Sequence, residues 1–291
     1  MSARPSHPPL GAHVSVAGGL ANAFPRGEEL ACTAIQIFVK NANQWRARPL
    51  AEEEVEEFRA AREASAIGPV VAHASYLVNL AASAPAVRER SVAALADEMG
   101  RCARLGVDAL VLHPGAHLGA GEEVGVERAA AALDRALDAA FADHPDAGTR
   151  LLLENTAGQG TCLGHRLEHL TEIRTRSAHA SRIGVCLDTC HAFAAGYALH
   201  EEAGYEEFWG EVDGRLGLGL VGCLHLNDSA KTFASRRDRH AHIGEGEMGI
   251  APFARLLNDQ RLAKVPMVIE TETGDDREGH RRDLATLRGL W

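Results

Sequence analysis

The 291-residue sequence predicts an α/β fold, a single-domain (β/α)8 barrel, from two observations. Short, continuously apolar segments alternate strictly with longer helical segments, and eight of each can be counted. Unbroken apolar strands are typical of parallel sheets that are buried on both faces. Eight such units close economically into a TIM barrel with long loops at the carboxyl ends of its strands. An open, doubly wound sheet is the alternative, but it needs no such even count.

The elements follow from local patterns. The expected strands span 10–14, 34–39, 70–74, 109–113, 151–155, 183–188, 221–226 and 266–271. The expected helices span 18–32, 51–67, 85–106, 126–144, 163–177, 201–216, 251–260 and 280–291. Acidic residues fill the first turn of the helix over 51–67, where the helix dipole favours them. Pro85 and Gly106 stand where helices commonly begin and end. Residues 1–9 are expected to be a disordered lead-in, and residues 10–291 the barrel domain.

Composition limits the classes of function. The formal net charge of -10 argues against a nucleic-acid partner, although bound metal ions reverse the local sign. Cationic residues also gather in two predicted loops, as Lys40, Arg46, Arg48, Lys231, Arg236, Arg237 and Arg239. Six cysteines without a CxxC pair suit reduced thiols in the cytoplasm. No apolar run approaches the roughly 18 residues that cross a membrane, so no membrane partner is expected.

Side chains that bind metals recur where the predicted strands end. In chain order they are His73, His113, Glu154, Asp188, His225 and Glu270. Loops add His191 and the pair Asp238 and His240, whose alternate spacing points both side chains to one side of an extended chain. Each residue taken singly also suits helix capping or hydrogen bonding. Because the strand ends of a barrel meet at one rim, we expect all nine to converge there.

Nine such groups suit three metal ions, each with three or four protein ligands. Imidazole and carboxylate ligands without thiolate favour zinc, so three Zn²⁺ per chain are expected, with Mn²⁺ or Fe²⁺ the alternative at one site. The positive charge of three divalent ions exceeds the negative charge of the four carboxylates, which makes the pocket positive and suited to a phosphate. Cys186 and Cys190, which flank Asp188, are expected to be buried structural thiols.

The remaining histidines are expected to lie outside the ligand set. His13, at the end of the first strand, is expected to support a ligand from behind. Six others fall on predicted helices or loops, where solvated side chains are expected: His144, His165, His169, His179, His200 and His280.

Eight segments in order resemble the signature blocks of one known family. They are GAHVSVAGGL, KNANQW, HASYLVNLA, LVLHPGAHL, LLLENTAGQG, GVCLDTCHAFAAGY, HLNDSAKTFASRRDRHAHIGEG and VIET. They resemble endonuclease IV, the metal-dependent apurinic/apyrimidinic endonucleases (AP endonuclease family 2). The resemblance runs from about residue 10 to residue 290, and the blocks ENTAGQG, DTCHAFAAGY and DRH…GEG together are highly specific.

The resemblance implies a trinuclear zinc site on a TIM-barrel nuclease domain over residues 10–291. His73 and His113 would hold one zinc ion, and Glu154 would bridge it to a second. The second would also be held by Asp188, His225 and Glu270, and the third by His191, Asp238 and His240. Glu154 would be the catalytic residue, positioning the attacking water and accepting its proton.

The implied activity is that of deoxyribonuclease IV, a phosphodiester hydrolase of DNA base excision repair. It cleaves on the 5′ side of an abasic site, leaves a 3′-hydroxyl and a 5′-deoxyribose phosphate, and trims blocked 3′ ends as a 3′-phosphatase and 3′-phosphodiesterase. The expected partner is therefore double-stranded DNA with abasic sites or blocked 3′ ends. The expected enzyme is a cytoplasmic monomer associated with the bacterial nucleoid.

Residues in three predicted loops are expected to contact DNA. Tyr76 and Leu77 would fill the gap left by the missing base, although packing is the alternative for both. Lys40, Arg46, Arg236 and Arg237 would contact phosphates, with solvated surface charge the alternative. The sequence departs from the family pattern at two places. Asn43 stands where the family often has an arginine that enters the DNA stack, and Ala74 where a polar residue often follows the histidine.

Two other functions compete with this one. A divalent-metal sugar isomerase or epimerase on the same barrel would use Glu154, Asp188, His225 and Glu270 but would need neither His73 and His113 nor the Asp238 and His240 pair. A non-catalytic binder of damaged DNA would keep its zinc as a structural element. The number of metal ions per chain distinguishes the isomerase or epimerase from the nuclease. A cleavage assay distinguishes the non-catalytic binder from the nuclease.

Overall fold

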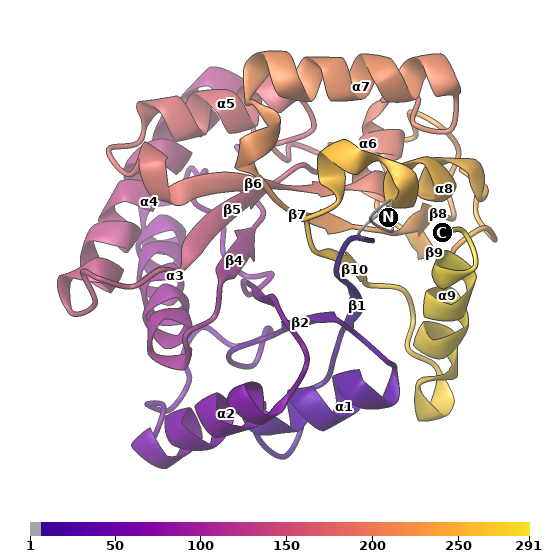
Figure 1. Ribbon diagram of the computed structural model, residues 1–291. Helices are drawn as coiled ribbons and strands as arrows, with labels where there is room; N and C mark the ends of the chain where they lie inside the picture. The colour runs from indigo at the N-terminus through magenta and orange to yellow at the C-terminus, as the bar shows by residue number, and fades with distance from the viewer. Residues whose placement is uncertain (1–6) are drawn as a thin grey trace.

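The structure, a computed structural model that describes residues 7–291, is built around a closed barrel of eight parallel strands (Figure 1). The order around the barrel is β1-β10-β7-β6-β5-β4-β3-β2. The strands are β1 (Leu10–His13), β2 (Ala34–Ile37), β3 (Val70–His73), β4 (Ala109–Leu112), β5 (Arg150–Glu154), β6 (Ile183–Asp188), β7 (Val221–His225) and β10 (Met267–Ile269). The predicted (β/α)8 architecture is confirmed.

Helices surround the barrel, as Figure 1 shows. They are α1 (Ala23–Glu29), α2 (Glu52–Ala64), α3 (Pro85–Leu105), α4 (Glu122–Ala142), α5 (Leu167–Arg176), α6 (Thr189–Ala195), α7 (Glu202–Arg215), α8 (Ala251–Asn258) and α9 (Glu278–Arg288). Short 3-10 helices are η1 (Leu20–Asn22), η2 (Ala180–Arg182), η3 (Leu218–Leu220), η4 (Gln260–Leu262) and η5 (Asp275–Arg277). The expected helices are present, with α6 as an addition that the sequence patterns do not predict.

The predicted helix ends follow the expected chemistry. The first turn of α2 holds Glu52, Glu53 and Glu54, and α3 begins with Pro85 in its first turn. Gly106 ends α3 in the left-handed conformation, with φ 72°, which a side chain would strain. These signals are local, so the sequence predicts them without knowledge of the tertiary fold.

Two apolar layers hold the barrel together. A large cluster fills the space between the strands and the helices, and it includes Phe24, Phe58, Leu95, Trp209 and Phe253. A second, smaller cluster takes side chains from strands around the barrel: Ala34, Val71, Ala109, Val111, Leu152, Cys186, Cys223 and Val268. Since alternate residues of a strand share one side, the residue two places after each of these also faces the barrel interior.

A small antiparallel ribbon shapes the long loop after β7. It pairs β8 (Asp228–Ser229) with β9 (His240–Ala241). The buried carboxylate of Asp228 accepts hydrogen bonds from the backbone N–H groups of Ser229, Gly244, Gly246 and Met248. The ribbon and this carboxylate therefore fix the segment that carries Asp238 and His240.

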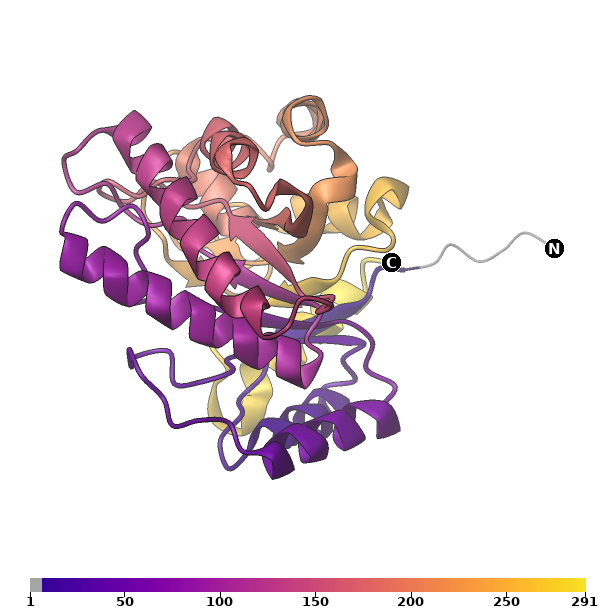
Figure 2. The same ribbon diagram turned by 90° about the vertical axis from the view of Figure 1, so that its left-hand side faces the viewer.

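The two ends of the described chain lie close together (Figure 2). The ring of His7 stacks on Trp291 with centroids 4.4 Å apart, and the carbonyl of Pro9 accepts a hydrogen bond from Met267 N–H. Residues 1–6 of the expected disordered lead-in fall outside the described residues, whereas residues 7–9, also expected to be disordered, are held by these contacts. Over residues 7–291, none of the helices has the length and apolar character that a membrane crossing demands.

Candidate metal centre

The period of two along each strand places the predicted ligands at one end of the barrel interior. Val71 precedes His73 by two residues, and Leu152 precedes Glu154 in the same way. The same spacing links Val111 to His113, Cys186 to Asp188, Cys223 to His225 and Val268 to Glu270. An apolar layer therefore lies directly beneath a layer of imidazoles and carboxylates.

The first group joins His73, His113 and Glu154. Oε2 of Glu154 lies 3.2 Å from Nε2 of His73 and 3.0 Å from Nε2 of His113. The Nδ1–H of His73 donates to the carbonyl of Ala74 at 2.7 Å, which leaves Nε2 as the free nitrogen facing Glu154. His73 and Glu154 are buried, whereas the side chain of His113 is 35 % exposed on the open side of the group.

The second group shares Glu154 with the first. Its other oxygen, Oε1, lies 2.9 Å from Nδ1 of His225. The same nitrogen lies 3.3 Å from Oε2 of Glu270 and 3.9 Å from Oδ2 of Asp188. Ligand atoms of all four residues lie within 4.8 Å of one another. Glu154 thus connects the two groups through its two oxygens.

The third group depends on the unpredicted helix α6. Asp188 is the N-cap of α6, and its Oδ1 accepts a hydrogen bond from the backbone N–H of His191 at 2.8 Å. Nε2 of His191 lies 3.1 Å from Oδ2 of Asp238, and Nε2 of His240 lies 3.3 Å from Oδ1 of Asp238. Oδ2 of Asp188 lies 3.7 Å from Nε2 of His240, so Asp188 connects the second group to the third.

The structure thus brings all nine predicted side chains into one centre of three overlapping groups. Burial raises the pKa of Glu154, but the adjacent His225 and His113 imidazoles outweigh it and hold this pKa well below its usual value. Burial likewise disfavours a charged His240, yet the Asp238 and Asp188 carboxylates raise its pKa to about 9. The carboxylates and imidazoles of this centre therefore stabilise each other's charged forms.

Among the nine ligand side chains, one buried atom lacks a hydrogen-bond partner. Nε2 of His240 is buried and makes no hydrogen bond to the described residues, although the carboxylates of Asp188 and Asp238 lie nearby. Buried polar atoms are almost always satisfied. A cation bound between this nitrogen and the carboxylates would satisfy it, so the ligand set fits a metal ion on geometry as well as on chemistry.

The sulfur of Cys190 lies within 4.8 Å of ligand atoms of Asp188 and His240, but its thiol is held protonated. Cys190 is buried, its Sγ–H donates to the carbonyl of Arg239 at 3.7 Å, and burial raises the pKa of the thiol to about 12. Cys186 belongs to the apolar layer below the centre. Because only a thiolate ligates a metal strongly, the protonated Cys190 suits the predicted structural role.

The centre is supported by three buried amide side chains, which strand-end spacing does not predict: Gln36, Asn155 and Asn227. Asn227 donates from Nδ2 to Oδ2 of Asp188 at 2.7 Å, and its Oδ1 accepts the backbone N–H of Glu270 at 2.8 Å. The side chain of Asn155 holds the backbone of Asp188 through two hydrogen bonds. The signal for Gln36 is a single polar residue inside the apolar strand AIQIFV.

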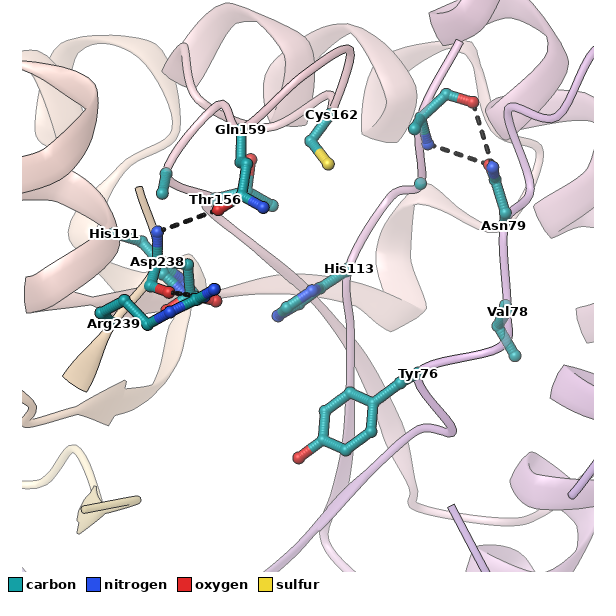
Figure 3. A pocket seen from close by; sticks show the side chains of 13 residues that line it. Tyr76, Val78, Asn79, His113, Thr156, Gln159, Cys162, His191, Asp238 and Arg239 are labelled. Atoms are coloured by element: carbon teal, nitrogen blue, oxygen red, sulfur yellow. Dashed lines mark hydrogen bonds and ion pairs between the residues drawn. The ribbon is translucent and has the colours of Figure 1, made fainter. Parts of the chain in front are cut away.

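The centre opens into two hollows. A groove of about 980 Å³ runs past Phe38, His73, His113, Asp238, His240 and Glu270. A neighbouring pocket of about 280 Å³ has His113, Tyr76, Gln159, Cys162 and Asp238 in its lining. Figure 3 shows His113 facing this pocket from one side, and His191 with Asp238 from the other. The ligand groups are therefore accessible to a substrate.

Known proteins resemble this chain over nearly its whole length. Residues 24–290 match the family model described as xylose isomerase-like TIM barrel. Probable endonuclease 4 of Chloroflexus aurantiacus is 49% identical over 97% of this chain and 98% of its own, and that of Geobacter sulfurreducens is 47% identical over 97% and 94%. The crystal structure of endonuclease IV from Thermus thermophilus has a TM-score of 0.84 at 39% identity, covering 97% of this chain and 98% of that one.

The chain belongs to the endonuclease IV family. The resemblance inferred from the sequence motifs is therefore confirmed. A D-tagatose 3-epimerase-like protein has a TM-score of 0.73 at 19% identity, and D-psicose 3-epimerase from Clostridium cellulolyticum has one of 0.67 at 16% identity, so the fold is shared with a sugar epimerase. The barrel alone consequently does not separate an endonuclease IV from an epimerase, and the ligand groups must do so.

Most of the predicted DNA-contacting residues of this endonuclease IV family member are accessible. Tyr76 is 64 % exposed and lines both hollows. Leu77 beside it is half-buried. Exposed side chains near the rim include Asn43, Arg46, Arg236 and Arg237. Of these, Asn43 lines the groove directly.

Lys40 is a correction to the predicted phosphate contacts. Its side chain is only 2 % exposed, and Nζ lies 3.1 Å from Oε1 of Glu98 on α3. The ammonium also donates to the carbonyls of Gln44 and Trp45, each at 3.1 Å. A cation that is buried, paired with a carboxylate and hydrogen-bonded to two carbonyls in this way does not suit a surface contact to a phosphate. Lys40 instead anchors the loop that carries Asn43 and Arg46.

Three histidines that were expected to be solvated are buried, and this expectation was wrong for them. His165 and His169 pack edge to face with ring centroids 5.0 Å apart, and Glu122 lies next to both. Nδ1 of His169 accepts the N–H of Gly164 at 3.1 Å. His280 donates from Nε2 to the carbonyl of Thr271 at 2.9 Å. Tertiary partners from other segments bury these rings, which local sequence does not reveal.

Proposed function

We propose that this chain is a metal-dependent endonuclease that hydrolyses DNA on the 5′ side of an abasic site. The products would be a 3′-hydroxyl and a 5′-deoxyribose phosphate, and the same centre would remove blocking groups from 3′ ends. The observation that supports this most strongly is the set of three overlapping ligand groups joined by Glu154 and Asp188. Membership of the endonuclease IV family supports the same reaction.

The nine converging side chains would hold three ions. His73, His113 and Glu154 would hold the first, and Glu154, Asp188, His225 and Glu270 the second. His191, Asp238 and His240 would hold the third. These ligands suit zinc, with manganese or iron an alternative at one site. Bound divalent ions would supply a water nucleophile at neutral pH and positive charge for the phosphate and the leaving oxygen.

Glu154 is the proposed catalytic residue. Its carboxylate is fully buried and its pKa is held low, so it is ionised at neutral pH and accepts hydrogen bonds. An ionised carboxylate at the junction of two groups orients an attacking water towards the phosphorus and takes up its proton at Oε1 or Oε2. Asp188 links the second and third groups through a single oxygen, Oδ2, which lies near both His225 and His240.

Recognition of the lesion would rest on the groove beside the centre. DNA without a base is cheap to unstack and bend at that place. The exposed ring of Tyr76, held edge-on against Phe38 with centroids 5.6 Å apart, offers a stacking surface for the neighbouring base pair. Leu77 would extend this surface. A sugar without its base would enter the 280 Å³ pocket next to His113.

Local charge would offset the overall negative charge of the chain. Arg46, Arg236 and Arg237 are exposed on loops at the rim and are the proposed phosphate contacts. Asn43 stands where the family resemblance implies an arginine, so this chain would rely less on that position. The formal charge of -10 is spread over the whole molecule and does not set the potential at the rim.

The centre favours this reaction over sugar isomerisation. An isomerase needs only the quartet Glu154, Asp188, His225 and Glu270. In this chain His73, His113, His191, Asp238 and His240 extend the quartet on both sides, and all nine ligand atoms belong to linked groups. A structural zinc site is closed by its ligands, whereas His113 is exposed on the open side of the first group, which disfavours a binder without activity.

A cleavage assay tests the proposal. A duplex with one abasic site, labelled at its 5′ end, is incubated with the zinc-loaded protein, with and without EDTA. We expect one incision at the 5′ side of the lesion, a product whose 3′ end a polymerase extends, no reaction with EDTA, and recovery on adding Zn²⁺. An unmodified duplex is the control. Absence of incision by fully loaded protein would refute the proposal.

A further inference from the structure

One fully buried amide stands next to the second ligand group. Gln36 lies in the middle of β2, two residues after Ala34 of the inner apolar layer, and is 0 % exposed. Its Oε1 lies 2.8 Å from Nε2 of His225. Its Nε2 lies 2.6 Å from Oε1 of Glu270 and 3.0 Å from Nδ1 of His13. The amide thus contacts two of the four residues in this group.

The carboxylate of Glu270 determines which way the amide points. An ionised carboxylate only accepts hydrogen bonds, so the NH₂ group of Gln36 must face it. The second N–H of this group is then directed to Nδ1 of His13, which accepts. The amide oxygen is left for His225. Because this oxygen only accepts, the Nε2 of His225 must carry a hydrogen.

This hydrogen decides which nitrogen of His225 binds the metal. With Nε2 protonated, the neutral ring has its lone pair on Nδ1. Nδ1 is the atom that faces the ligand group, 2.9 Å from Oε1 of Glu154 and 3.3 Å from Oε2 of Glu270. The hydrogen-bond partners and the geometry therefore agree on Nδ1 as the ligand atom.

Two other histidines of the centre are arranged in the opposite way. His73 donates from Nδ1 to the carbonyl of Ala74 at 2.7 Å, and His191 donates from Nδ1 to the carbonyl of Asn155 at 2.9 Å. Both therefore present Nε2 to the centre. A backbone carbonyl only accepts, so it fixes a ring without help. The side-chain amide at His225 needs a second partner to fix it, and Glu270 is that partner.

We propose that Gln36 is a positioning residue for the second metal ion, one that sets the Nδ1 tautomer of His225 and orients the carboxylate of Glu270. This inference rests on the proposed metal-dependent function. Partners of this kind change metal affinity by about 10- to 100-fold when they are removed. Gln36 touches two ligands of one ion, so its loss should weaken the second ion selectively and leave the first and third in place.

A purely structural role for Gln36 makes a different prediction. A buried amide inside a barrel also contributes hydrogen bonds to stability. Thr149 offers a matched control, because its buried hydroxyl donates to the carbonyl of Val107 at 2.7 Å just before β5, at the opposite end of the barrel strands. Thr149→Val removes one buried hydrogen bond without touching the centre.

The experiment compares the unmodified chain, Gln36→Met and Thr149→Val after loading with Zn²⁺ alone. Zinc release to a competing chelator is followed in each protein. We expect one of three ions to bind about 10- to 100-fold more weakly in Gln36→Met, and parental affinity for all three in Thr149→Val. Equal affinities in Gln36→Met and the unmodified chain would overturn the proposal, as would equal weakening of all three ions.

A second measurement does not depend on whether a Gln36 variant folds. Nitrogen-15 NMR of the zinc-loaded, unmodified chain distinguishes a ring bound through Nδ1 from one bound through Nε2. We expect Nδ1 ligation with a protonated Nε2 for His225, and the reverse for His73 and His191. Ligation of His225 through Nε2 would refute the assignment. Neither readout uses DNA cleavage, so a zinc-binding chain that fails to cut abasic DNA would refute the proposed function and leave this inference standing.

Discussion

Oε1 of Glu154 lies 2.9 Å from Nδ1 of His225, although 71 residues separate the two in the chain. The other oxygen of Glu154 faces His73 and His113. One carboxylate therefore belongs to two ligand groups at once. Its removal should affect the chemistry far more than the fold, because the apolar layers inside and outside the barrel do not depend on it.

Glu154→Gln keeps the size of the side chain but removes its negative charge. We expect kcat for abasic-site cleavage to fall by about 10²- to 10⁴-fold, the usual loss for a residue that handles a proton in the transition state. Glu123→Gln, on the exposed face of α4, is the matched control. A Glu154→Gln enzyme with kcat within tenfold of the parent would exclude Glu154 from the reaction.

Tyr76→Ala tests the stacking surface. Base stacking on an aromatic ring contributes about 1–3 kcal/mol, so the Kd for abasic duplex should rise about tenfold to a hundredfold. Tyr76→Phe retains the ring and should retain the affinity. Fluorescence anisotropy in the Glu154→Gln background measures binding without cleavage. Because the ring is 64 % exposed, thermal stability should stay constant. Unchanged affinity of Tyr76→Ala would remove this residue from lesion recognition.

The proposed phosphate contacts of Arg236 and Arg237 predict how the affinity for DNA depends on salt concentration. Each phosphate contact contributes a slope of about -0.9 to the dependence of log affinity on log salt. Replacing Arg236 and Arg237 by glutamine should make this slope less steep by about 2 if both contact phosphates. The control is Arg59→Gln. Arg59 lies on α2 and lines a pocket together with Gly68 and Gly106, at the other end of the barrel. A slope that stays at the parental value would place both arginines away from DNA.

The buried His169 predicts a dependence of stability on pH. Burial, followed by the charge of His165, lowers the pKa of His169 below its ordinary value of 6.5, and Nδ1 already accepts the N–H of Gly164. A lowered histidine pKa means that the unfolded chain binds more protons, so this contribution is present above pH 6.5 and is lost as the pH falls below it.

His169→Asn keeps an acceptor near Gly164 but does not titrate. Between pH 7 and pH 5 the free energy of unfolding should therefore fall less steeply in His169→Asn than in the parent, as measured by urea denaturation of metal-free protein. Metal-free protein is used so that competition between protons and metal ions at the proposed ligands does not contribute. Identical slopes for the two proteins would show that His169 titrates equally in the folded and unfolded chains.

Much of the fold and the centre can be predicted because the signals are periodic. Strand ends can be recognised locally, and the period of two then points His73, Glu154 and Glu270 to the same side as the apolar residues before them. A closed barrel brings these ends to one rim. The positions of the six strand-end ligands therefore follow from the strand pattern and the topology, whereas those of His191, Asp238 and His240 depend on α6 and on the loop after β7.

Other features depend on partners that local sequence does not indicate. Gln36 contacts His225, which is 189 residues away in the chain, and the sequence of β2 does not indicate this partner. Lys40 has the loop context of a surface cation, but Glu98 on a later helix buries it. The rings of His165 and His169 are covered through contacts with Glu122 from another helix. Local patterns predict which groups are present, whereas pairing across elements decides which are exposed.

The most direct test of the central claim is the number of metal ions per chain in active protein. Elemental analysis of the purified enzyme, together with a zinc titration of metal-free protein, measures it. Three linked ligand groups predict about three ions for each chain, all of them needed for full cleavage of abasic DNA. Fully active protein with fewer than two ions per chain would contradict this account.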